Sequence, residues 1–76
     1  METAYVMITC EMGSEHSLIE KIRPIEGVQE VSGVYGNYDV LVKIQSHTID
    51  EISKRIIANI RRLEKIRCTT TLMCSN

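Results

Sequence analysis

The chain has 76 residues, with nine lysines and arginines against ten aspartates and glutamates, which gives a formal net charge of −1. Apolar residues make up 43% and charged residues 25%, a composition typical of one small globular domain and not of a disordered or fibrous chain. The charge balance argues against a basic surface for nucleic acid or anionic lipid. No apolar run reaches the length of a membrane span and the N-terminus lacks a signal peptide's positive charge, so we expect no membrane contact and a cytoplasmic location.

The first half of the chain predicts a strand, a helix and a hairpin. Residues 4–10 show the two-residue alternation of a strand with both faces partly apolar. Ser14 is a good N-cap for a helix, and Pro24 stops that helix. Residues 28–34 and 38–44 predict two strands. The glycine and asparagine between them accept positive φ, so we expect a short turn and an antiparallel hairpin.

The second half predicts a helix and a final strand. Thr48 and Glu51 fit a capping box, in which each side chain satisfies the other residue's backbone N–H. An apolar stripe at helical spacing follows, and Glu51 and Arg55 are placed for an i,i+4 ion pair. Residues 66–73 close the chain as a strand.

The order β-α-β-β-α-β contains an internal repeat. Residues 25–28 lead from the first helix into a strand, and residues 63–66 do the same after the second helix, at an offset of 38 residues. This pattern predicts an α+β, ferredoxin-like split βαβ fold, with four antiparallel strands and both helices on one face. The other face of such a sheet would carry four large apolar residues, Tyr5, Met7, Leu41 and Met73. We therefore expect sheet-against-sheet dimerisation into a dimeric α/β barrel.

Catalytic and metal-binding patterns are absent from the sequence. It has no nucleophile elbow, no phosphate-binding loop and no metalloprotease motif. Cys10, Cys68 and Cys74 form no CxxC pair and lie far in sequence from His16 and His47, so we expect no metal, redox or other cofactor site.

One polar constellation stands out, at Gly36-Asn37-Tyr38-Asp39 and at Thr69-Thr70-Thr71. A carboxylate beside glycine N–H groups, with hydroxyls within reach, suits a zwitterion: Asp39 takes the ammonium group, while N–H and O–H donors take the carboxylate. The alternative is that Asp39 caps its own turn and that the threonines are ordinary strand residues.

The same residues resemble the ligand-binding domain of the Lrp/AsnC (feast/famine) regulators, which is called RAM for regulation of amino acid metabolism. Gly36-x-Tyr38-Asp39 before an apolar strand is similar to the family's G-x-Y-D pattern. Thr69-x-Thr71 matches the closing T-x-T, and residues 25–28 match the family's usual approach to the second strand. The resemblance extends from the first strand to Thr71.

This resemblance implies dimers that associate into rings, commonly octamers, with amino acid effectors in clefts between dimers. It implies a cleft lined by Gly36, Asn37, Tyr38, Asp39, Thr69 and Thr71. Two features depart from the family pattern. Residues 64–66 lack the glycine that often precedes the last strand, and the chain starts almost directly on its first strand, without a helix-turn-helix. We therefore expect a stand-alone domain over residues 1–76 that binds no DNA directly, with a full-length Lrp/AsnC regulator as a further partner.

Two alternatives remain open from the residues. An ACT-type regulatory domain shares the strand order and places its amino acid near a glycine after the first strand, where Gly13 stands. A small ferredoxin-like dimeric enzyme, such as a monooxygenase or isomerase, would need a polar or basic group facing an apolar pocket. The sequence has no obvious candidate for that group, and it has three tyrosines but no tryptophan or phenylalanine.

Overall fold

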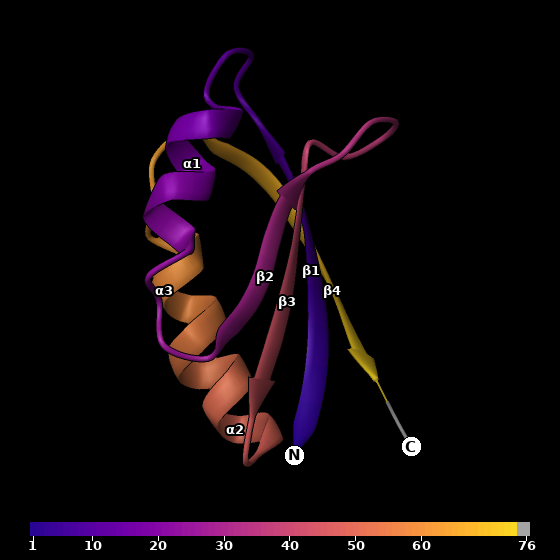
Figure 1. Cartoon of the computed structure of the whole chain (residues 1–76), viewed down its shortest axis with the longest axis vertical. Helices are drawn as coiled ribbons and strands as arrows, with labels where there is room; N and C mark the ends of the chain where they lie inside the picture. Colours follow the sequence, from indigo (N-terminus) through magenta and orange to yellow (C-terminus); the bar gives the residue numbers. More distant parts are fainter. Residues whose placement is uncertain (75–76) are drawn as a thin grey trace.

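The computed structural model describes residues 1–74 and contains a four-stranded antiparallel sheet in the order β2-β3-β1-β4 (Figure 1). The two strands that come first in each half of the chain, β1 and β3, therefore lie side by side at the centre, and β2 and β4 form the edges. This order confirms the ferredoxin-like α+β fold. The strands are β1 (Glu2–Cys10), β2 (Val28–Gly33), β3 (Val40–Ser46) and β4 (Ile66–Cys74).

Both helices lie on the same face of the sheet (Figure 1). The first is α1 (Glu15–Ile22), which ends before Pro24 as predicted. The second is a continuous helical run with a π-helical middle: α2 (Ile49–Glu51), η1 (Ile52–Ile56) and α3 (Ile57–Arg61). The wider π turn accompanies the burial of two consecutive residues, Ile56 and Ile57, which an ideal α-helix would point about 100° apart.

The helix caps agree with the sequence in part. Thr48 Oγ1 accepts the predicted hydrogen bond from the Glu51 backbone N–H at 3.1 Å. The reciprocal half of the capping box is wrong, because the Glu51 carboxylate instead accepts from Ser46 Oγ at 3.0 Å and from Arg55 at 3.1 Å. Ser14 precedes α1 but its side chain caps no N–H. Its hydroxyl donates to the carbonyl of Glu11 at 2.6 Å, so this side chain closes the loop rather than the helix.

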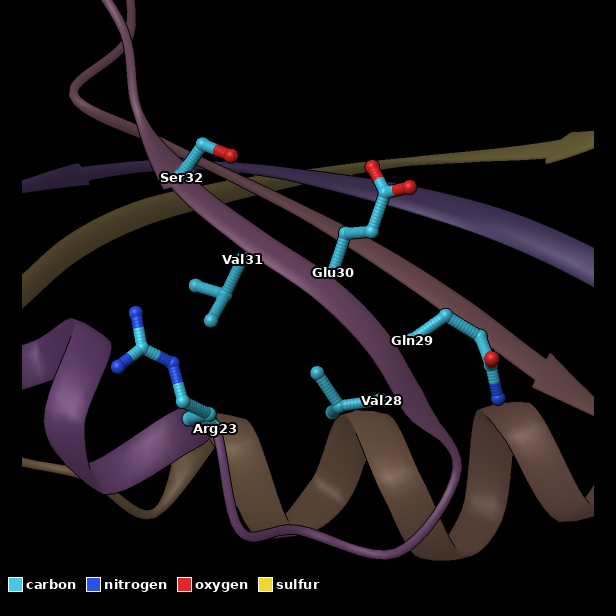
Figure 2. Close-up of a pocket in the computed structure, with 6 residues that line it drawn as sticks. All are labelled: Arg23, Val28, Gln29, Glu30, Val31 and Ser32. Atoms are coloured by element: carbon cyan, nitrogen blue, oxygen red, sulfur yellow. The ribbon is translucent and has the colours of Figure 1, made fainter.

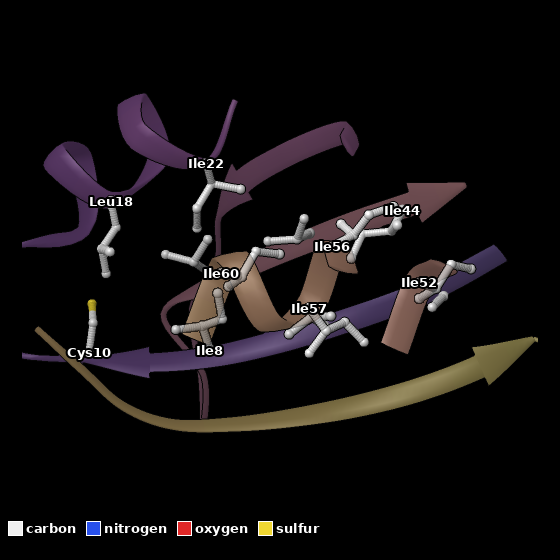
Figure 3. Packing of buried hydrophobic residues seen from close by; sticks show 13 residues of the cluster. Ile8, Cys10, Leu18, Ile22, Ile44, Ile52, Ile56, Ile57 and Ile60 are labelled. Carbon is white, nitrogen blue, oxygen red and sulfur yellow. The ribbon is translucent and has the colours of Figure 1, made fainter. Parts of the chain in front are cut away.

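The core lies between the helices and the sheet (Figure 3). Every second residue of β1 and β3 is buried there, which is the two-residue period that the sequence shows. Leu18 and Ile22 of α1 and four isoleucines of the second helix cover them. The core residues are Ala4, Val6, Ile8, Cys10, Leu18, Ile22, Val40, Val42, Ile44, Ile52, Ile56, Ile57 and Ile60.

The strand register corrects the predicted composition of the open face. Directly paired residues of neighbouring strands project to the same face. Met73 pairs with buried Ala4 and therefore lies on the helix side, where the sequence analysis did not expect it. Leu72 pairs with Tyr5 and takes its place, with 53% of its surface exposed. The large apolar residues of the open face are Tyr5, Met7, Leu41 and Leu72.

The chain enters both edge strands through similar turns. Gly27, before β2, has φ +97°, and Lys65, before β4, has φ +77°. Lys65 thus adopts the left-handed conformation without the glycine that the family often has at this turn. At Gly27 a side chain would clash with Ile56 Cδ1, so glycine is needed there for space as well as for φ.

No helix within residues 1–74 is long and apolar enough to span a membrane.

Candidate functional site

The hairpin residues of the candidate site lie at one end of the sheet, between β2 and β3 (Figure 1). Gly36 and Asn37 are exposed, and Gly36 has φ +111° with open space around it. Tyr38 and Asp39 are half-buried. Since β3 begins at Val40 and not at Tyr38, Asp39 lies at the strand's start rather than inside it.

Asp39 is held by three hydrogen bonds. Its N–H donates to the carbonyl of Ile8 at 2.8 Å, and its carbonyl accepts from Val34 N–H at 2.9 Å. Its carboxylate Oδ2 accepts from the backbone N–H of Cys10 at 2.9 Å. The side chain therefore joins the start of β3 to the end of β1, and does not cap its own turn.

Thr69 and Thr71 lie on β4, on the helix side of the sheet. They pair with buried Ile8 and Val6 respectively. Arg61 of α3 donates from Nε to Thr69 Oγ1 at 3.3 Å. Thr71 Oγ1 is buried and finds no hydrogen-bond partner in the described part of the chain.

Within a single chain, the hairpin residues of the candidate site lie apart from its threonines. Strand β1 separates Asp39 from β4, so two strand spacings put Asp39 roughly 10 Å from Thr69. Thr71 is two residues further along β4, three residues from the level of Asp39, and lies roughly 14 Å away from Asp39. The ammonium and carboxylate of an amino acid are attached to the same carbon. A single amino acid therefore cannot contact Asp39 and Thr71 of the same chain.

Cys10 lies beside Asp39, and Glu15 is a second carboxylate near Cys10. Burial raises the pKa of the Cys10 thiol; the nearby Asp39 and Glu15 carboxylates raise it further, and a hydrogen bond from Ser14 opposes them. The thiol therefore stays protonated at neutral pH and is a poor nucleophile. Glu15 has a buried carboxylate oxygen without a hydrogen-bond partner in residues 1–74. The position of Glu15 at the start of a helix does not predict this burial. Residues 1–74 contain no group of three or more potential metal ligands.

Two surface grooves border the edges of the sheet. One follows edge strand β2, where Arg23 and the side chains of Val28 and Val31 lie toward the helices and Glu30 and Ser32 project on the other side (Figure 2). The other lies between the second helix and β4 and is about 350 Å³ in volume. Its lining residues are Ser53, Ile57, Arg61, Thr71 and Met73.

We call this second groove the α3–β4 groove. It contains functional candidates that the sequence analysis did not predict. Ser53, Ile57 and Arg61 follow one another at intervals of four, which places them on one helix face. That spacing is visible in the sequence. It gains meaning when β4 is known to lie beside this face, because Thr71 and Met73 then complete the groove.

Comparison with known proteins identifies the family. The model of the Lrp/AsnC ligand binding domain matches residues 3–76, which is nearly the whole chain. The chain therefore belongs to the Lrp/AsnC ligand-binding domain family, as the G-x-Y-D and T-x-T motifs indicated. This match favours the RAM interpretation over the ACT-type alternative.

The relatives include regulators and small proteins. An uncharacterised HTH-type transcriptional regulator of Pyrococcus furiosus is 31% identical over 74 residues, which cover 93% of this chain and 49% of the regulator. This chain thus spans about half the length of that relative. The crystal structure of a hypothetical protein from Pyrococcus horikoshii superposes with a TM-score of 0.91 at 30% identity, covering 100% of this chain and 92% of that one.

A third relative is an enzyme. Homocitrate synthase of Saccharolobus solfataricus is 38% identical over 55 residues, which cover 72% of this chain but 12% of the enzyme. The match therefore concerns a small part of that enzyme. The matched family is defined by ligand binding.

Proposed function

We propose that this chain is a cytoplasmic, non-enzymatic module that binds an amino acid and controls its own assembly in response. The match to the Lrp/AsnC ligand binding domain over residues 3–76 is the observation that carries this proposal. The Lrp/AsnC regulators bind amino acid effectors and oligomerise. An effector shifts assembly when it binds one assembly state better than another.

The open face of the sheet supports a homodimer as the smallest unit. Tyr5, Met7 and Leu41 alternate with buried residues and project away from the helices, and Leu72 lies beside Tyr5. Covering a large apolar side chain contributes roughly 1.5–3 kcal/mol. A second copy of the same sheet presents a matching surface about a two-fold axis, so the dimer closes as an α/β barrel.

The separation of the two site halves supports a binding cleft between copies. Gly36, Asn37, Tyr38 and Asp39 lie at a hairpin, and Thr69 and Thr71 lie across β1. In the proposed assembly the hairpin of one copy approaches the threonines of another. Asp39 then takes the ammonium group and the threonine hydroxyls contact the carboxylate. Repetition of this contact around an axis builds a ring, an octamer or a similar assembly.

Native mass spectrometry with and without each of the twenty amino acids tests the proposal. We expect a dimer or a multiple of a dimer, one amino acid that adds its mass, and a changed distribution of oligomers in its presence. Mixing with a full-length Lrp/AsnC regulator also tests mixed assemblies, a further part of the proposal. A stable monomer that binds no amino acid contradicts the proposal.

A further inference from the structure

The α3–β4 groove has a buried polar atom that lacks a partner. Thr71 lines the groove, and its Oγ1 is buried with no hydrogen-bond partner within residues 1–74. A hydroxyl kept from water without a partner is destabilising. A ligand with a polar group in the groove would complete the hydrogen bonding of such an atom.

A cation, Arg61, lines the same groove. Arg61 donates from Nε to Thr69 Oγ1 at 3.3 Å, which directs the guanidinium group toward β4. Arg61 forms no ion pair with a carboxylate of residues 1–74, whereas Arg55 and Arg23 each have a glutamate partner. The terminal guanidinium nitrogens of Arg61 therefore remain available to an external acceptor.

The other lining residues indicate the chemistry of the rest of the ligand. Ile57 and Met73 supply apolar surface, and Ser53 adds one hydroxyl. The groove contains no aspartate or glutamate, so nothing in it matches an ammonium group. A guanidinium group directed toward β4, an unpartnered hydroxyl and apolar walls together are complementary to a carboxylate that carries a short aliphatic chain.

We propose that the α3–β4 groove binds the carboxylate of a small aliphatic acid through Arg61 and Thr71, with Ile57 and Met73 against its chain. The proposal rests on the proposed function in one respect: it assigns the carboxylate of the effector to the Thr69–Thr71 half of the site. It also extends that function, because the groove has no carboxylate that would bind an ammonium group. A 2-oxo acid therefore also binds this groove, although more weakly than the corresponding amino acid wherever Asp39 of another copy takes the ammonium group.

Calorimetric titration with three matched probes tests the groove. L-leucine has both charged groups, 4-methyl-2-oxopentanoate has the carboxylate alone, and L-leucinamide has the ammonium alone. We expect the two acids to bind and the amide to bind at least tenfold more weakly. Arg61→Ala weakens binding of both acids roughly 10- to 100-fold, because a charge-assisted hydrogen bond is lost. Arg62→Ala removes an equal charge from the neighbouring residue, outside the groove, and leaves both affinities unchanged.

Thr71→Val gives a second readout with an opposite sign. The methyl group replaces a buried hydroxyl that has no partner, so the melting temperature of the unliganded chain stays equal or rises. The affinity for 4-methyl-2-oxopentanoate falls. A purely structural Thr71 predicts no change of affinity.

The outcomes separate this inference from the proposed function. If leucinamide binds as tightly as leucine, if Arg61→Ala retains full affinity, or if neither acid binds, the carboxylate groove is wrong. If another amino acid changes the assembly while Arg61→Ala leaves its affinity intact, the proposed function stands without this groove. If the oxo acid binds but no amino acid alters the assembly, the groove stands and the amino acid effector is wrong.

Discussion

The carboxylate of Asp39 accepts a hydrogen bond from the backbone N–H of Cys10 at 2.9 Å, between residues 29 positions apart. This contact lies where β1 ends and its pairing with β4 changes register between Thr9 and Cys10. An irregular strand end leaves N–H groups without ladder partners. Asp39 supplies the missing acceptor, so a residue proposed for effector binding also holds the end of the sheet together.

Two substitutions at Asp39 separate these roles. Asp39→Ala leaves the Cys10 N–H unpaired and lowers the free energy of unfolding by about 1–3 kcal/mol. Asp39→Asn keeps an oxygen acceptor of the same size and loses the negative charge. We therefore expect Asp39→Asn to melt near the temperature of the unmodified chain and to bind its amino acid roughly 10- to 100-fold more weakly. Thermal melts and calorimetric titration on both variants measure the two effects. Unchanged effector affinity in Asp39→Asn would leave the residue a structural role alone.

The sequence predicts the fold well because its signals are local. The alternation in residues 4–10 and the cap at Thr48 depend on near neighbours, and both are confirmed. The partner of Asp39 was missed because Cys10 is far away in the sequence and becomes a neighbour through the β1–β3 pairing. Met73 was assigned to the wrong face because the face of an edge strand depends on its register with β1.

The turn before β4 stores strain that a single substitution relieves. Lys65 has φ +77°, a conformation that costs a non-glycine residue roughly 1–2 kcal/mol. Lys65→Gly should therefore raise the free energy of unfolding by about 1 kcal/mol, after the greater flexibility of glycine in the unfolded chain is counted. Glu64→Gly, one residue earlier, is the control and should be neutral or destabilising. Chemical denaturation of both variants measures the difference, and a less stable Lys65→Gly contradicts the explanation.

At the corresponding turn before β2, a substitution should lower the free energy of unfolding instead of raising it. Gly27→Ala forces a side chain into φ +97° and against Ile56 Cδ1. We expect a loss of stability of about 1–3 kcal/mol, since strain and overpacking act together. Gly36 also has positive φ but is surrounded by open space. Gly36→Ala therefore tests the effect of positive φ without a clash, and it should lower the free energy of unfolding by less than Gly27→Ala does.

A charge on the open face should break the proposed dimer. Met7 lies in this face at β1, and Met7→Glu introduces a carboxylate that a facing sheet would have to desolvate. We expect dissociation or unfolding in size-exclusion chromatography with light scattering. Leu72→Glu tests the same face on the edge strand β4, where the core is not disturbed. Met12→Glu is the matched control, because Met12 is 99% exposed in a loop. Dimers that survive both face substitutions contradict sheet-against-sheet packing.

The 76-residue chain should not bind duplex DNA by itself. Its net charge is −1, and Arg55 on the second helix is neutralised by contacts with Glu51 and Glu26 at 3.1 and 3.5 Å. Nucleic acid binding depends on unpaired cations that replace counterions on phosphates. A gel-shift assay at physiological salt checks this, and binding with a steep salt dependence contradicts it.

The cysteines should differ in reactivity because their surroundings differ. Cys68 is exposed on β4, whereas Cys10 is buried and its pKa is raised, first by burial and then by the Asp39 and Glu15 charges. Iodoacetamide at neutral pH should therefore label Cys68 well before Cys10, which mass spectrometry can follow. The raised pKa also affects stability. Above about pH 8.5 the unfolded chain loses a proton that folded Cys10 keeps, so the free energy of unfolding falls as the pH rises. Cys10→Ala should remove this part of the pH dependence and Cys68→Ala should retain it. Equal labelling rates for the two thiols would contradict the buried, protonated state of Cys10.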